Sequence, residues 1–74
     1  MIIYDFSKLK GRIVEKCGTQ EDFAVKMGKS RASISSKLNN KATFSSDEIE
    51  KAKNILEITN DEIGMYFFTY KVQN

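Results

Sequence analysis

The sequence predicts a compact all-α domain of five short helices. Three observations lead to this prediction. The 74 residues contain no proline and many residues that favour helices. Apolar residues recur at helical spacing in several segments, and a serine or threonine precedes most of these segments, where it can cap a helix. A chain this short forms a single domain with a small core, because it buries only about 60% of the surface that its unfolded form exposes.

The first helix is expected to begin at Asp5 or Ser7, either of which can cap it, and to end at Gly18. Its apolar residues fall at i, i+3, i+7, i+8 and i+11, so they share one stripe that should face the core. These residues are Phe6, Leu9, Ile13, Val14 and Cys17. The residues before the helix, Met1 to Tyr4, are apolar and are expected to be extended.

Two short helices joined by a tight turn are predicted in residues 19–41. Thr19 can cap the first of them, which should run from about Gln20 to Met27, and Asp22 can complete a capping box three residues after Thr19. Gly28 then tolerates the left-handed conformation that ends many helices. Two helices joined by a turn of about three to four residues that contains glycine form a helix-turn-helix, whose second helix can enter the major groove of DNA.

The second helix of this motif is expected to begin after Ser30, its cap, and to run from Arg31 to about Leu38. Ile34 and Leu38 are four residues apart and define its buried side. The opposite side is small and polar, with Arg31 at its edge, and consists of Lys29, Ala32, Ser33, Ser36 and Asn40. Small side chains let a helix sink into a groove, hydroxyl groups can contact bases or phosphates, and an alanine methyl can meet a thymine methyl.

Positive charge is concentrated on this second helix and its flanks. Residues 26–41 contain five basic residues and no acidic one, whereas residues 42–74 contain three basic and six acidic residues. The net charge of +2 decides little by itself, but this uneven distribution fits a surface that binds a polyanion.

A fourth helix is predicted from Ser46 to about Glu57, because Ser45 and Glu48 form a capping box. It follows a polar loop that begins at residues 39–41. The residues expected to be buried by this helix and just before it are Phe44, Ile49, Ala52, Ile55 and Leu56.

Thr59 and Glu62 repeat the capping box before a last short helix from Asn60 to about Tyr66, which should turn Ile63 and Tyr66 inward. Residues 66–72 then become aromatic and prone to β structure, with side chains that alternate between two faces. Two arrangements would cover this segment: a two-stranded pairing with residues 1–4, or the seam of a homodimer. They do not exclude each other.

The motif resembles the helix-turn-helix of phage repressors, of Cro proteins and of the larger Xre-like family. The residues that carry this resemblance are Gln20, Ala24, Gly28, Ile34 and Leu38, with Asn39 to Lys41 closing the unit. The segments YDFSKLKGRI, FSSDEI and YFFTYKVQ are similar to small Cro-like phage proteins of Gram-positive bacteria, so the resemblance covers nearly the whole chain. It implies a lambda-repressor-like arrangement of the five helices. One position departs from the family, which usually has an apolar residue where this chain has Lys37.

The resemblance also implies roles for individual residues in DNA binding. Gln20, Ser30, Asn39 and Lys41 would bind backbone phosphates. Arg31, Ala32 and Ser36 would contact bases, with Ser35 as a near alternative to Ser36. Lys29 and Lys37 would add unspecific electrostatic affinity. The chemistry agrees, because helix N-termini donate N–H groups to phosphates and arginine suits the acceptors of guanine.

The sequence is therefore interpreted as a Cro-like transcriptional regulator that binds double-stranded DNA. We expect a homodimer that occludes a promoter at a palindromic operator, with residues 31–38 in the major groove. The alternative is a helical protein-interaction module that binds and silences another regulator.

Other classes of function find no support in the composition. The chain has no histidine, one cysteine, no phosphate-cradling loop and no suitably spaced pair of carboxylates, so we expect no enzyme, metal, cofactor or small-molecule ligand. No apolar run approaches the roughly 18 to 20 residues of a membrane span, and residues 1–6 lack the features of a signal peptide. We expect the protein in the cytoplasm of a bacterial host cell.

Overall fold

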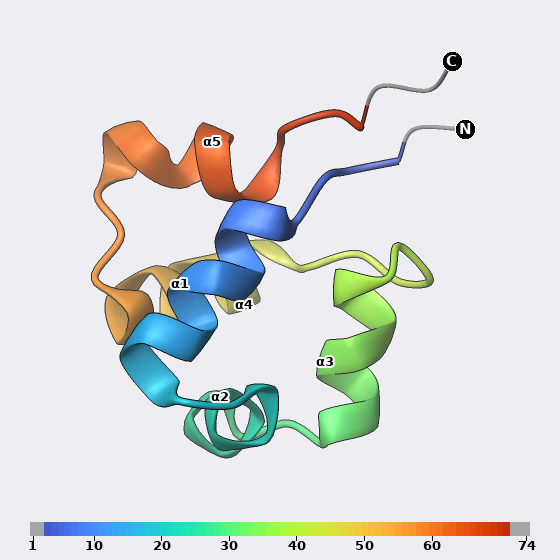
Figure 1. The fold of residues 1–74 in the computed structure, drawn as a ribbon, viewed down its shortest axis with the longest axis vertical. Helices are drawn as coiled ribbons and strands as arrows, with labels where there is room; N and C mark the ends of the chain where they lie inside the picture. The colour runs from blue at the N-terminus through green and yellow to red at the C-terminus, as the bar shows by residue number, and fades with distance from the viewer. Residues whose placement is uncertain (1–2, 72–74) are drawn as a thin grey trace.

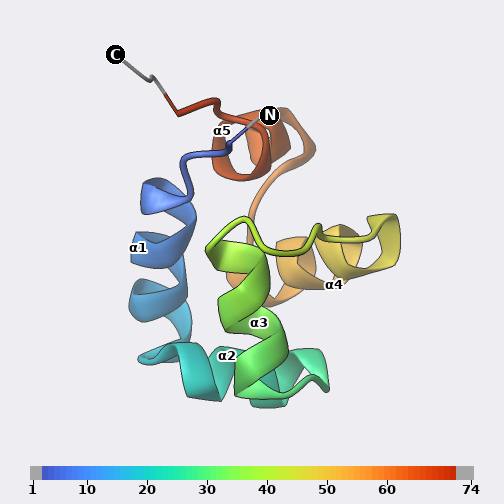
Figure 2. The same cartoon turned by 90° about the vertical axis from the view of Figure 1, so that its right-hand side faces the viewer.

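The computed structural model describes residues 3–71, and the helices of this part of the chain confirm the all-α prediction (Figure 1). They are α1 (Ser7–Cys17), α2 (Gln20–Met27), α3 (Arg31–Leu38), α4 (Ser46–Leu56), the 3-10 helix η1 (Asn60–Glu62) and α5 (Ile63–Phe67). Figure 2 looks onto α3, with α1 on one side of it, α4 on the other and α2 at its lower end. None of these helices is long and apolar enough to cross a membrane.

The capping residues predicted from the sequence begin three of the helices. The Thr19 hydroxyl accepts a hydrogen bond from the Asp22 N–H at 3.0 Å, and the Ser30 hydroxyl accepts one from the Ser33 N–H at 3.1 Å. Ser45 and Glu48 form the complete capping box at the start of α4. Asp22 does not return a bond to Thr19 in the structure, because its side chain is one methylene shorter than that of glutamate.

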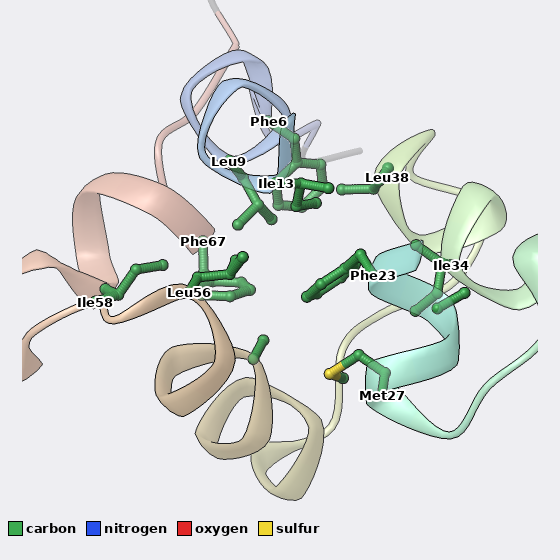
Figure 3. Close-up of a cluster of buried hydrophobic side chains, with 12 residues drawn as sticks. Phe6, Leu9, Ile13, Phe23, Met27, Ile34, Leu38, Leu56, Ile58 and Phe67 are labelled. Carbon is green, nitrogen blue, oxygen red and sulfur yellow. The ribbon is translucent and has the colours of Figure 1, made fainter. Parts of the chain in front are cut away.

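The core is centred on Phe23 of α2, which is fully buried and points between α1, α3 and α4 (Figure 3). The buried apolar residues come from every α-helix, from the residue before α1 and from the segment after α4. They are Phe6, Leu9, Ile13, Phe23, Ala24, Met27, Ile34, Leu38, Ala52, Leu56, Ile58 and Phe67. Ile34 and Leu38 point inward as predicted, so the opposite side of α3 is left on the surface.

Three details differ from the sequence predictions. Val14 is 58% exposed rather than buried, because Leu9 and Ile13 already fill the narrow side of α1 that faces this small core. Helix α4 ends at Leu56, since Glu57 adopts a left-handed conformation with φ 54°. Helix α5 extends to Phe67, which turns that ring into the core.

The two ends of the described chain lie side by side (Figure 1). The Asp5 N–H donates to the Thr69 carbonyl at 2.7 Å, and the Lys71 N–H donates to the Ile3 carbonyl at 2.8 Å. Tyr4 and Tyr70 thereby form an antiparallel bridge. This agrees with the first of the two predicted arrangements at residues 3 and 4, although within residues 3–71 it is a single bridge and not a pair of strands. The predicted partners at residues 1, 2 and 72 lie outside the described residues.

Candidate functional site

Helices α2 and α3 and the turn between them form the predicted helix-turn-helix. Gly28 adopts the left-handed conformation with φ 70°, and its N–H donates to carbonyl groups in the last turn of α2. The Lys29 N–H also donates to the Ala24 carbonyl at 2.9 Å, so this turn is tightly closed. Ser30 then starts α3, whose outer side is uncovered (Figure 2).

The structure places the predicted DNA-binding residues at three positions on this motif. Gln20 is the first residue of α2 and is half-buried. Those at the start of α3 and just before it are exposed: Lys29, Ser30, Arg31 and Ala32. Two predicted residues further along α3, Ser35 and Ser36, are half-buried. Two that follow the end of α3, Asn39 and Lys41, are exposed. One face of α3 therefore brings together most of these residues, while Gln20 belongs to the neighbouring helix.

Several polar groups on this face already have partners within the chain. The Ser30 hydroxyl is used as the cap of α3. The Asn39 side-chain amide donates to the Ser35 carbonyl at 2.8 Å and to the Ser35 hydroxyl at 3.2 Å. A ligand that used these side chains would compete with, or share, the existing hydrogen bonds.

Two of the positive charges on this motif face one carboxylate. Lys37 is hydrogen-bonded to Glu48 of α4, and the Lys29 Nζ lies 3.7 Å from the Glu48 Oε2. The side chain of Glu48 is only 11% exposed. Lys37 is therefore a link between α3 and α4, and the expectation that it adds affinity for DNA stays a prediction. Among residues 3–71, no ion pair involves Arg31 or Lys41.

The pKa of Glu48 reflects this position. Burial raises the pKa of this carboxyl, but the hydrogen bonds with Lys37 and Ser45 and the positive charge of Lys37 together outweigh burial. They lower the pKa from 4.5 to about 2. The charge of Glu48 therefore stabilises the contact between α3 and α4.

Replacing Glu48 with glutamine should lower the free energy of unfolding by about 1 to 3 kcal/mol at neutral pH, because Lys37 loses its charged partner. Glutamine can still accept the bond from the Ser45 N–H, so the capping box remains. Since the pKa is lower in the folded state, the charge stabilises fully above about pH 4.5 and the stabilisation is lost as the pH falls towards 2. The difference between the two proteins in urea denaturation should shrink over this range.

Glu50→Gln is the matched control for this measurement. Glu50 lies on the same helix, is exposed and pairs only with Lys53 at 3.5 Å in the described residues, so we expect a change below about 0.5 kcal/mol. A difference between wild type and Glu48→Gln that stays constant from neutral pH down to about pH 2 would contradict the stabilising role of the Glu48 charge.

Asn40 has a structural role that the sequence did not indicate. It was expected on the outer face of the motif, but its side chain turns towards the N-terminal segment. The Tyr4 N–H donates to the Asn40 Oδ1 at 2.9 Å, and the Asn40 Nδ2 donates to the Tyr4 carbonyl at 3.0 Å. Asn40 also adopts a left-handed conformation with φ 62°, which asparagine tolerates better than most residues. The sequence indicates only that asparagine tolerates a left-handed conformation. It does not indicate the hydrogen bonds with Tyr4, because Tyr4 and Asn40 are 36 positions apart in the chain.

No cluster of three or more histidine, cysteine or acidic side chains that could hold a metal ion occurs in residues 3–71. Cys17 is a free, half-buried cysteine that packs against the core. The features of chemical interest are therefore the surface of α3 and its connections.

Comparison with known proteins gives a family match and a match to a solved structure, each covering nearly the whole chain. The model of the family described as "Protein of unknown function (DUF739)" matches residues 2–70. The solution structure of the modulator of repression (MOR) of the temperate bacteriophage TP901-1 from Lactococcus lactis is 51% identical, with 95% of each chain covered and a TM-score of 0.80. No curated protein matches.

These matches agree with the resemblance to phage regulatory proteins that the sequence showed. The narrower resemblance to Cro and Xre-like proteins stays a prediction, since neither match names them. The family model spans far more than half of the chain, and the chain therefore belongs to the DUF739 family.

Proposed function

We propose that this protein is a phage regulator that modulates repression by binding another regulatory protein. The observation that carries the proposal is the 51% identity, over 95% of both chains, to a protein described as a modulator of repression. This was the alternative reading of the sequence, and it is now the better supported one. The protein would act in the cytoplasm of the bacterial host.

The charges on the helix-turn-helix support the same proposal. Binding to DNA depends strongly on cations that are free to neutralise phosphates. Lys37 is committed to Glu48, and Lys29 lies near the same carboxylate. Arg31 remains free on the exposed start of α3, and arginine is among the side chains that contribute most to protein interfaces. A face with few free cations and small side chains suits a protein partner.

Direct binding to an operator is the second candidate. It is favoured by the geometry of the helix-turn-helix, since Arg31 and Ala32 lie at the start of α3, where residues of such helices contact bases. In this case Ser35 or Ser36 would also face bases, while Gln20, Ser30, Asn39 and Lys41 would hold phosphates. One such unit rarely provides enough specificity, so this candidate includes a homodimer on a palindromic site.

Binding measurements with two partners separate the two candidates. The partners are the repressor protein of the same phage and duplex DNA that carries the operators of that repressor. We expect a complex with the repressor in titration calorimetry, and little binding to duplex DNA even at about 50 mM salt, where true DNA binders gain affinity. Arg31→Ala should weaken the complex about 5- to 30-fold, as expected for an interface arginine.

Lys8→Ala is the control, because Lys8 is an exposed cation on α1, away from the helix-turn-helix. It should leave the affinity for the repressor unchanged. Tight, sequence-selective binding to DNA without a complex with the repressor would instead support the second candidate. Arg31→Ala would then cost about 1 to 3 kcal/mol and relax the preference at one base pair.

A further inference from the structure

Six of the eight aromatic side chains gather at one corner of the domain. The corner is formed by the N-terminal segment, the loop after α3 and the C-terminal segment. Its members, here called the aromatic cluster, are Tyr4, Phe6, Phe44, Phe67, Phe68 and Tyr70. Five pairs of these rings have centroids 5.4 to 5.9 Å apart, within the range of favourable aromatic contacts, and together the pairs connect all six rings.

The aromatic cluster extends from the core to the surface. Phe6 and Phe67 are buried, whereas Phe68 is 48% exposed and Tyr70 is 64% exposed. Small domains seldom leave neighbouring aromatic rings on the surface without a use, and exposed apolar patches often mark binding sites. Tyrosine in particular is frequent among the residues that dominate the energy of protein interfaces.

A hollow of about 130 Å³ opens between these rings. Its apolar walls are Tyr4, Phe6, Phe44, Ile49, Phe67 and Phe68. An apolar cavity of about 150 Å³ is large enough to bind benzene, so this hollow is the size of a single aromatic ring. The two hydrogen bonds between Asn40 and Tyr4 fix the backbone of Tyr4, and the hollow is therefore preformed rather than assembled on binding.

The surroundings of the hollow are positively charged. A second hollow shares Tyr4 and Asn40 with the first and has Lys10 and Lys71 on its walls. Asp5 is the one acidic residue on those walls. Hydrogen bonds from Ser7 lower the pKa of the Asp5 carboxyl, and the charges of Lys71 and Lys10 lower it further.

Lys71 is exposed and Lys10 is half-buried, while Lys41, which follows Asn40 in the chain, is exposed but lines neither hollow. None of the three lysines forms an ion pair in the described part of the chain. Two cations, Lys10 and Lys71, against the one carboxylate of Asp5 leave an excess of positive charge beside an apolar hollow. A ligand that complements both features has an aromatic ring beside a carboxylate.

We infer that the aromatic cluster is a docking site for a segment of a partner protein that presents an aromatic side chain next to an acidic one. The partner's ring fills the hollow between Phe44 and Phe68, and its carboxylate faces Lys10 and Lys71. The inference rests on the proposed function for the existence of a protein partner. The chemistry of the site, however, can be tested on the full chain alone.

The experiment is a ¹H–¹⁵N NMR titration of the full chain with three small probes: phenylacetate, benzyl alcohol and benzylamine. We expect phenylacetate to shift the amide signals of Asn40, Thr43, Phe44 and Phe68. Its affinity should exceed that of benzyl alcohol at least about threefold at low salt, and benzylamine should bind most weakly. Equal shifts with benzylamine and phenylacetate, or shifts that avoid the aromatic cluster, would overturn the inference.

Two variants sharpen this titration. Ala42 is exposed and lines the hollow, so Ala42→Leu should block the site and abolish the shifts without entering the core. The double variant Lys10→Gln, Lys71→Gln keeps the hollow and removes charge, so phenylacetate and benzyl alcohol should then bind equally well. Binding of phenylacetate that persists in Ala42→Leu would exclude the hollow as the site.

The repressor titration distinguishes this inference from the proposed function. If wild-type protein binds the repressor but phenylacetate does not bind the aromatic cluster, the inference fails and the proposed function stands. If phenylacetate binds as expected but the repressor does not, the proposed function fails. Loss of repressor binding in Ala42→Leu, with the fold intact by NMR, would support both.

Discussion

Replacing Phe23 with alanine should destabilise the domain by about 3 to 5 kcal/mol, the usual cost of removing a fully buried phenylalanine. The ring has no exposed surface and lies between α1, α3 and α4, so no neighbouring helix can close the space without moving away from another (Figure 3). Small domains have little stability to lose. Circular dichroism should therefore show a largely unfolded variant at about 37 °C and a greatly lowered urea midpoint.

Phe23→Leu is the control for this prediction. It keeps most of the apolar volume and should cost clearly less, about 1 to 1.5 kcal/mol. If alanine and leucine at this position had the same small effect, Phe23 would not be the centre of the core.

The second large effect is expected at Asn40. Asn40→Ala removes both hydrogen bonds to Tyr4 and places alanine in a left-handed conformation, so we expect a loss of about 2 to 3 kcal/mol. Asn40→Gly also removes the hydrogen bonds but tolerates the backbone conformation. It should fall between alanine and the wild type, and the gap between the two variants measures the backbone strain.

Urea denaturation gives these free energies, and amide hydrogen exchange at Tyr4 gives an independent measure. Exchange at Tyr4 should accelerate in both variants, since both leave its N–H without the Asn40 acceptor. Protection that remains as high in Asn40→Gly as in the wild type would show that the side-chain amide does not hold the N-terminal segment.

The parts of the fold that were predictable from the sequence depend on contacts within a few residues. Thr19, Ser30 and Ser45 each cap a helix through a group three positions ahead, and such pairs can be read directly from the chain. Val14 shows where this approach ends. Helical spacing gives the direction of a side chain, but not the width of the core that receives it.

The features of the candidate site that could not be predicted from the sequence depend on contacts between residues far apart in the chain. The link from Lys37 to Glu48 joins two helices, and it gives Lys37 a structural contact that the sequence did not indicate. Asn40 changes from a surface residue to a connector for the same reason. The choice between DNA and protein as partner was not predictable either, because a small polar face with Arg31 at its edge suits both.

The contact between Asp5 and Thr69 has a consequence for the order of folding. It joins residues that are 64 positions apart (69 minus 5), so closing this loop costs more chain entropy than any helix cap in the domain. Contacts of such long range slow folding and form after the local ones. We therefore expect the corner that carries the aromatic cluster to be completed last, so that the proposed partner would bind only chains that have finished folding.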